Sequence, residues 1–501
     1  MDRLARRDFL MELGGSVVAG AAAWGAGAGA IEAVSPAFAA DAQVTPDIVQ
    51  FRPEMEPIVQ WIERTPRERA FAVAADQLKA GLSYRQLLAG LFLAGIRNIK
   101  PRPVGFKFHA VMAIESAHQI ALDAPQADRL LPLFWALDNF KASQARDIAE
   151  GDWTLAPVKE SEVPSASQAR QRFKEAMDRW DDSAADAAVA GLCRAAGAGE
   201  VMELCWLYGG RDWQNIGHKI IFTAHACRTL HTIGWEHAEP VLRSLVYGLL
   251  NGGASDTAKP YTTNQALVKQ VRPNWAAGKP DAAAAHDLLA TLRKATPDEA
   301  ARAAVEMLNR GVAAASLWDG IMLASGDLLM RKVGIPSLHA TTACNSLHYA
   351  FRASGRDETR LLMLLQACSW VALFREAVRS RDGLPDAPLI DKLEPATESG
   401  VVETVFHGLK NNRLEAARRV LTLAGNDQSA ASFMDVARHL VMTKGNDSHD
   451  YKFASAAFEE FAQASPAVRP QLLASSVYYL KGATDSDSPL LDRTRQALAR
   501  L

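Results

Sequence analysis

Histidines in apolar stretches are the residues of this 501-residue sequence best placed to do chemistry. A neutral imidazole is the commonest metal ligand in proteins, and burying one without a partner is costly. One buried histidine is ordinarily a hydrogen-bonded core residue. Several helices that each carry one indicate a metal site, because a helical bundle collects ligands from facing helices. Three such stretches are FHAVMAIESAH (108–118), GHKIIFTAH (217–225) and LHATTACNSLH (338–348).

Helical periodicity limits which of these histidines can share one ion. His109 and His118 are nine residues apart, and about 100° per residue places them on opposite faces. The same argument separates His339 from His348. One histidine of each pair is therefore the better ligand, and we expect His109 and His339, which open their helices.

His218 and His225 share a helix face, because seven residues are close to two full turns. They lie about 10 Å apart along the axis at ~1.5 Å per residue, so both cannot easily reach one ion. We expect His218 to bind the metal and His225 to line the substrate cavity. His225 and His348 are then candidate catalytic residues.

His449 and Lys452 are three residues apart and lie next to each other on a helix surface. A lysine at the start of a helix is ordinarily solvated, and a protonated amine would repel a metal. If burial near a metal lowers the pKa of the Lys452 amine, the neutral amine can add carbon dioxide and become a carbamate, an anionic oxygen ligand. Lys452 is thus a candidate ligand and a candidate catalytic residue.

The elements that must position these residues are helices. Apolar residues recur every three or four positions in nearly every segment, including 84–99, 109–122, 167–196, 216–233, 338–353 and 452–463. No alternating stretch of five or more residues predicts a strand. The predicted fold class is all-α, a large multi-helix bundle, with stacked helical hairpins as an alternative arrangement.

Three stretches read as longer surface connections: 150–167, 252–279 and 381–399. These connections divide the chain after residue 39 into an N-terminal helical half, 40–255, and a C-terminal helical half, 256–501. Histidines on both sides of this boundary predict that the halves share one buried site.

Composition excludes several classes of protein. Forty-nine per cent hydrophobic residues exclude a disordered chain, and a net charge of −2 excludes bulk binding of nucleic acid. The five cysteines are odd in number and form no C-x-x-C pair, so we expect buried reduced thiols.

The first 39 residues have the features of a twin-arginine export signal. Arg6 and Arg7 precede a weakly hydrophobic run rich in alanine and glycine, and Ala37-Phe38-Ala39 fits a signal peptidase site. An ordinary membrane anchor is the alternative. We expect the twin-arginine translocase as a partner during export, a periplasmic or otherwise exported location, and no stable membrane anchor after cleavage. This route carries folded proteins, often with a cofactor already loaded.

Acidic and aromatic side chains could support the site. Glu115, Asp138, Asp147 or Asp212 could orient a ligand imidazole, and they are equally plausible as structural ion pairs. Five tryptophans near the histidines could stack on a flat substrate, although each also reads as ordinary core: Trp135, Trp206, Trp213, Trp235 and Trp370.

The HDYK stretch (449–452), with the helices FHAVMAIESAH, IGHKIIFTAH and LHATTACNSLH before it, resembles the questin oxidase-like family. The resemblance spans most of the mature chain through the order and character of its helices. It implies ring-opening oxygenation of aromatic polyketides such as anthraquinones by a mononuclear non-haem iron, held by four histidines and a carboxylated lysine. Carried over, His449 is a ligand and Lys452 the carbamate, and we choose His109, His218 and His339 as the other ligands. The export signal departs from that family.

The leading hypothesis is a metal-dependent oxygenase, with Fe(II) as the expected metal and dioxygen and an aromatic or quinonoid small molecule as substrates. Two alternatives stay open. One is an exported helical binding or scaffold protein without catalysis. The other is a metal-dependent hydrolase that uses the same ligands to activate water.

Overall fold

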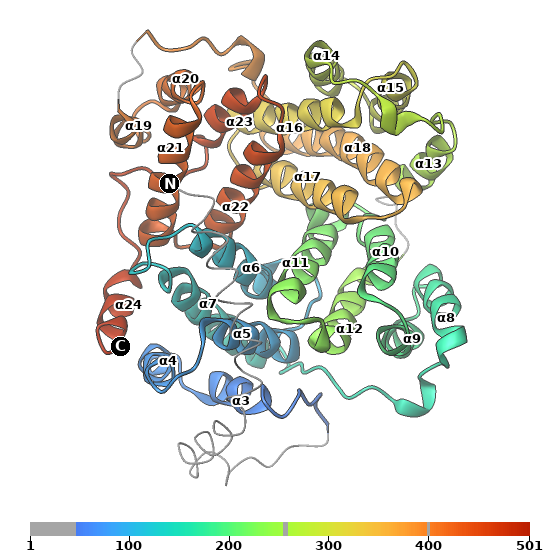
Figure 1. Ribbon diagram of the computed structural model, residues 1–501, viewed down its shortest axis with the longest axis vertical. Coiled ribbons are helices and arrows are strands. Elements are labelled where there is room, and N and C mark those ends of the chain that lie inside the picture. Colours follow the sequence, from blue (N-terminus) through green and yellow to red (C-terminus); the bar gives the residue numbers. More distant parts are fainter. Residues whose placement is uncertain (1–46, 254–258, 398–400) are drawn as a thin grey trace.

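The computed structural model describes residues 47–253, 259–397 and 401–501 (Figure 1). Over these residues the chain forms 22 α-helices, and the only β-type pairing there is an isolated bridge between Lys279 and Val312. The all-α prediction is confirmed. The predicted signal at 1–39 lies outside the described residues, and the boundary at 255 falls in the undescribed stretch 254–258.

The α-helices of the described residues are α3 (Glu56–Arg64), α4 (Ala70–Lys79), α5 (Tyr84–Asn98), α6 (His109–Leu122), α7 (Leu131–Ala149), α8 (Ala166–Asp178), α9 (Asp182–Ala195), α10 (Ala198–Gly209), α11 (His218–Ile233), α12 (Ala238–Leu249), α13 (Lys259–Val268), α14 (Ala282–Leu292), α15 (Pro297–Asn309), α16 (Ala314–Arg331), α17 (Ile335–Ala353), α18 (Asp357–Asp382), α19 (Val402–Gly408), α20 (Arg413–Leu423), α21 (Asp427–Lys444), α22 (Ser448–Gln463), α23 (Arg469–Ser476) and α24 (Leu491–Leu498).

Two sequence predictions about elements are wrong. The stretch 167–196 is two helices, because the backbone of Trp180 is left-handed (φ +57°) and the Asp181 side chain then caps α9. The supposed connection 252–279 contains α13, whose weak apolar pattern hides a helix. By contrast, α6 begins and ends as predicted.

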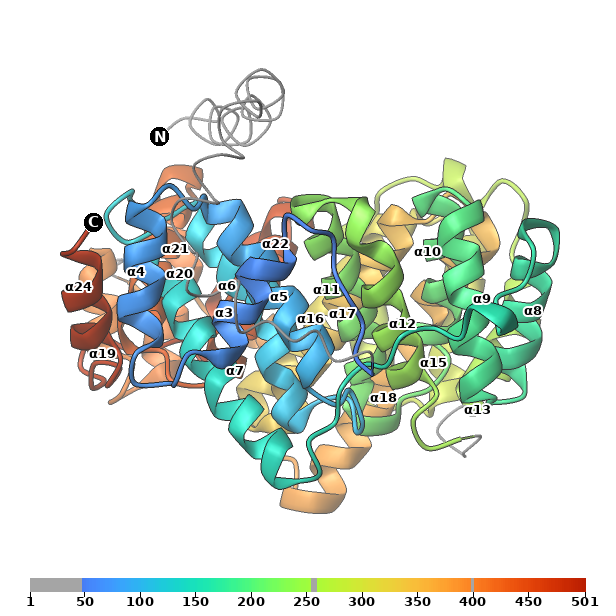
Figure 2. The ribbon, with the colours of Figure 1, turned by 90° about the horizontal axis from the view of Figure 1, so that it is seen from below.

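Four helices, α6, α11, α17 and α22, form a closed ring at the centre of the molecule (Figure 1). Each packs against two others in the order α6, α11, α17, α22 and back to α6. We call them the central bundle. Figure 2 shows α24 at one end of the molecule and α8 at the other, with α11 and α17 between them.

The surrounding helices bury the central bundle. Helices α5 and α7 pack against α6, while α16 and α18 pack against α17. This explains why α17 is buried on nearly its whole circumference, with fifteen consecutive or near-consecutive buried positions between Pro336 and Phe351. Of the described helices, α18 alone is long and apolar enough to cross a membrane, and 83% of its most apolar window is buried inside the protein.

The five cysteines are all free thiols, and four of them are buried. This agrees with the structural role expected from the sequence.

Candidate metal centre

Histidines near the N-terminal ends of the four helices of the central bundle point to one place. The prediction that His339 opens its helix is wrong, because α17 begins at Ile335. His109 and His218 are the first residues of α6 and α11, His449 is the second residue of α22, and His339 lies in the second turn of α17. Side chains of an α-helix lean toward its N-terminus, so four rings can meet where four helices begin. We call these four residues the histidine cluster.

All four helices run in the same direction away from the histidine cluster. Deeper in the bundle, the His225 ring contacts the Met112 carbonyl of α6, and the Asn345 amide of α17 donates to Glu459 of α22. Arg228 of α11 joins the same group. Residues that follow the cluster histidines on one helix thus contact residues that follow them on the next helix. The four helices are therefore parallel, and their N-terminal ends share one site.

The ring nitrogens are spaced as adjacent ligands of one ion. The Nε2 atom of His218 lies 2.8 Å from Nε2 of His109 and 3.0 Å from Nε2 of His339. Two nitrogens bound at about 2.1 Å and at right angles would lie about 3.0 Å apart. The ligand nitrogens of His109, His218 and His339 all lie within 4.8 Å of one another. The ring of His449 lies beside these three, with its centroid 4.7 Å from that of His109 and 5.1 Å from that of His339.

Every ring of the histidine cluster has its Nδ1 atom on an oxygen acceptor. An oxygen acceptor requires a proton on Nδ1. In His109, His218 and His339 the lone pair is therefore on Nε2, which faces the other rings. The acceptors are the carbonyl of Phe106 for His109 (2.9 Å), the carbonyl of Asn215 for His218, the carbonyl of Ile335 for His339 (2.7 Å) and the carboxylate of Asp447 for His449. Lone pairs this close repel one another, and a cation between them removes the repulsion.

Two of these acceptors come from strained backbone. Phe106 has φ +48° and Asn215 has φ +54°, both in the left-handed region, and Ile216 follows with φ +52°. Such a conformation costs about 1–3 kcal/mol for a residue other than glycine, and it persists only where the surroundings enforce it. The turns before α6 and α11 thus hold strained carbonyls against ligand rings.

Glycine is required at the closest approach of these turns. Gly105 has φ +111°, and a Cβ atom there would lie 3.1 Å from the ring of His218. The turn before α6 therefore packs directly on a cluster ring that belongs to α11.

Burial keeps the rings of His109, His218 and His339 uncharged. The pKa values of His109, His218 and His339 lie well below 6.5, first because burial disfavours the charged ring in each case. The nearby Lys452 amine and the neighbouring rings lower these pKa values further. Neutral imidazoles are the form that binds a metal.

Lys452 lies beside the histidine cluster with its amine unpaired. Its side chain is 2% exposed, and Nζ has no hydrogen-bond partner. Burial lowers the pKa of this amine to about 7. The Nε2 atom of His449 is likewise buried without a partner. The ordinary expectation of a solvated lysine at the start of a helix is therefore wrong for Lys452.

The candidate catalytic residues His225 and His348 lie outside the histidine cluster, deeper in the central bundle. His225 Nδ1 is 2.7 Å from the Met112 carbonyl and 3.7 Å from Glu115. His348 Nδ1 is 2.8 Å from Glu460, and its ring stacks on Trp318. Two turns or more separate them from the residues that open the helices.

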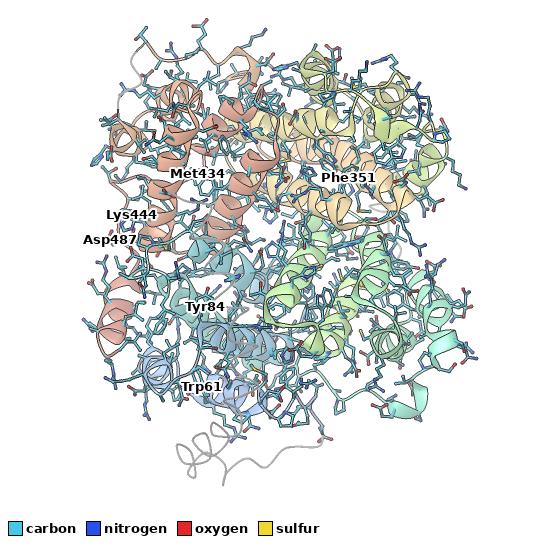
Figure 3. The ribbon with its side chains drawn as sticks, viewed as in Figure 1. Trp61, Tyr84, Phe351, Met434, Lys444 and Asp487 are labelled. Carbon is cyan, nitrogen blue, oxygen red and sulfur yellow. The ribbon has the colours of Figure 1, made fainter. Side chains whose placement is uncertain are left out.

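His118 also points away from the histidine cluster. Its Nδ1 atom lies 3.1 Å from the hydroxyl of Tyr84. Figure 3 labels Tyr84, and it also labels Phe351, whose ring lies near that of His348. The argument from opposite helix faces thus separated His109 from His118 as the structure does.

None of the acidic residues named from the sequence is the hydrogen-bond partner of a cluster ring. Asp138 pairs with Arg67 and Arg493, while Asp147 and Asp212 pair with lysines. The residue that sequence reasoning missed is Asp447, two positions before His449. A carboxylate next to a ligand histidine in the NDSHD stretch was the available signal.

The five tryptophans have protein partners. Trp135 stacks on Tyr451 with centroids 4.1 Å apart, and Trp206, Trp213 and Trp235 make edge contacts with other rings. Trp370 is fully buried near Gly217. They read as core.

Exposed apolar side chains lie near the histidine cluster. His109 and His449 are partly exposed, whereas His218 and His339 are buried. Phe106 and Ile335, whose carbonyls hold two of the rings, expose 65% and 42% of their surface. An apolar rim therefore borders the site at the surface of the protein.

Comparison of the chain with protein-family models, with curated proteins and with solved structures finds no match, so its function has to be argued from this geometry.

Proposed function

We propose that the protein is a metal-dependent oxygenase that holds a non-haem iron and acts on an aromatic or quinonoid small molecule. The observation that carries the proposal is the convergence of neutral imidazoles from three helices, with Nε2 atoms 2.8 and 3.0 Å apart and the ring of His449 beside them. Neither stability nor folding requires lone pairs to face each other, whereas a metal ion does.

The donor set fits iron. Imidazoles together with one carboxylate-type oxygen suit Fe(II) and leave positions open for substrates. His109, His218, His339 and His449 would hold the ion. When bound, Fe(II) would supply the electrons that activate dioxygen, which reacts only slowly with closed-shell organic molecules.

Lys452 would provide the oxygen ligand as a carbamate. Its neutral amine would add carbon dioxide to form an N–C bond, and the proton lost from nitrogen would leave to solvent. Burial and the lack of any partner for Nζ support this role, because an amine that made only structural contacts would be hydrogen-bonded.

The apolar rim supports an aromatic substrate. Phe106 and Ile335 expose large apolar surfaces within one helical turn of His109 and His339. A flat, apolar molecule would cover this rim and exclude water from the open side of the site.

The experiment is a metal analysis followed by a test of turnover. The purified protein, loaded anaerobically with Fe(II), should hold about one iron per chain, and His218→Ala should hold none. With an anthraquinone as the probe, substrate-dependent oxygen uptake supports an oxygenase. Absence of any near-stoichiometric transition metal would overturn the proposal, and turnover without oxygen uptake would favour the metal-dependent hydrolase.

Export belongs to the proposal as well. The Arg6-Arg7 pair and the small residues at 37–39 support passage through the twin-arginine translocase and a periplasmic location. Because this route carries folded proteins, the metal would be loaded before export. Replacing both arginines with lysine should retain the full-length chain inside the cell, as fractionation and immunoblotting would detect.

A further inference from the structure

Two buried lysine–aspartate pairs lie beside the two strained turns of the metal centre. Lys219 directly follows His218, and its Nζ atom is 2.8 Å from Asp212. Lys107 directly follows Phe106, and its Nζ atom is 2.6 Å from Asp147. The four side chains are at most 9% exposed.

The pair at α11 closes a loop around the strained residues. Asp212 precedes the turn and Lys219 follows it, so the ion pair ties together the two ends of a segment that contains three left-handed residues, Asn215, Ile216 and Gly217. Asp212 also accepts from the Gln214 amide at 3.0 Å. Lys219 donates further to the Asn251 carbonyl at 2.9 Å, which anchors the loop to the residues that follow α12.

The pair at α6 fixes its turn to a neighbouring helix. Asp147 belongs to α7 and accepts from Lys107 and from the backbone amides of Lys100 and Trp153, at 3.0 and 2.8 Å. Lys107 also reaches Glu150 at 2.8 Å. The carbonyl of Phe106 is thereby held in place against the ring of His109.

Stability alone does not account for these pairs. Taking two charges out of water costs several kcal/mol per ion, and replacing a buried pair with apolar residues is often neutral or stabilising. Lys107 directly follows left-handed Phe106, and the Lys219–Asp212 pair encloses left-handed Asn215. The carbonyls of Phe106 and Asn215 hold the rings of His109 and His218, and such strained backbone persists only where neighbouring contacts enforce it. The pairs supply those contacts.

We propose that the Lys219–Asp212 and Lys107–Asp147 pairs are positioning devices, which hold the turn carbonyls of Asn215 and Phe106 so that His218 and His109 aim Nε2 at the metal. This inference rests on the proposed metal centre. The inference adds four residues to the proposed metal centre, and none of the four would touch the metal or the substrate. Groups behind a ligand histidine typically change metal affinity by about 10–100-fold.

The test removes a pair without leaving one charge buried. Asp212→Asn combined with Lys219→Gln keeps both side chains polar and eliminates both charges. The matched control is Asp327→Asn with Arg293→Gln, a pair 2.7 Å apart whose aspartate is 2% exposed and also accepts from a backbone amide. That pair links the end of α14 to α16, and its other partners, Arg331, Asp391 and the Ile390 amide, are not residues of the histidine cluster.

Affinity for Co²⁺ is measured by competition with a chelator, and the visible absorption of the bound Co²⁺ reports ligand geometry. We expect the Asp212/Lys219 variant to bind at least about tenfold more weakly, with an altered spectrum, and the control to match the wild type. Unchanged affinity and spectrum in the Asp212/Lys219 variant, or an equal loss in the control, would overturn the inference.

Two further outcomes are distinguishable. If the double variant does not fold, Asp212→Glu retains the charge and lengthens the side chain by one methylene, and it should still shift the Co²⁺ spectrum; a wild-type spectrum would contradict the inference. If the wild-type protein itself binds no Co²⁺, Zn²⁺ or Fe²⁺, the metal centre is refuted and the positioning role falls with it.

Discussion

Asp447→Asn tests whether a charge behind His449 strengthens metal binding. Asp447 is the N-cap of α22: its carboxylate accepts from the His449 backbone amide at 2.8 Å and contacts Nδ1 of the same residue. Asparagine caps a helix about as well as aspartate, so the substitution retains the helix and removes the charge that makes the imidazole a stronger ligand.

The expected loss of metal affinity is near the lower end of the about 10–100-fold range that is typical for groups behind a ligand histidine. The Asp447 side chain is 64% exposed, so water screens much of its interaction with the ring. We therefore expect the Kd for Zn²⁺ to rise about tenfold, or ~1.4 kcal/mol. The melting temperature of the metal-free protein should not change.

The assay is chelator competition at pH 7.5 together with thermal unfolding of the metal-free protein. Asp181→Asn is the matched control, because Asp181 caps α9 by the same type of bond and has no histidine behind it. A Zn²⁺ affinity of Asp447→Asn within twofold of the wild type would refute the reasoning. So would a fall in affinity that is fully explained by loss of stability.

Three further predictions concern the histidine cluster and its lysine. His218→Ala should abolish stoichiometric metal in elemental analysis, whereas His225→Ala, buried on the same helix but outside the cluster, should retain it; metal loss in both would point to general unfolding. Lys452→Met removes an unpartnered buried amine, so the free energy of unfolding of the metal-free protein in urea should rise by about 1–3 kcal/mol. ¹³C-labelled bicarbonate should give a carbamate NMR signal in the wild type alone. A signal in the variant would place the carbamate on another residue. Because the pKa values of His109, His218 and His339 are depressed in the folded protein, the unfolded chain takes up more protons below about pH 6.5, so metal-free stability should fall as pH drops through that value. Urea unfolding from pH 5 to 8 would measure this, and a flat profile would show that the rings are not buried in neutral form.

Helical periodicity predicted much of the fold and part of the site. It placed His109 and His118 on opposite faces, and the structure brings only His109 to the cluster. The same holds for His339 and His348. These predictions succeed because facing helices of a bundle impose a regular geometry that sequence spacing records.

The remaining features depend on irregular backbone, which periodicity does not describe. The sequence predicts a helix from 216, yet Ile216 is left-handed and the helix begins at His218. A branched residue is strongly disfavoured in that conformation, so local preference argued against the turn that tertiary contacts enforce. The carbonyl acceptors of His109 and His218 were therefore invisible in the sequence, as was the break at Trp180.

The shared direction of the four central helices has an electrostatic consequence. Each helix carries about half a positive charge at its N-terminus, and four such ends surround the histidine cluster. A more highly charged ion is penalised more in this field than a less charged one. If the proposed iron is bound, the bundle would therefore raise its reduction potential and favour the ferrous state, and the orientation of the scaffold would help to set the resting redox level.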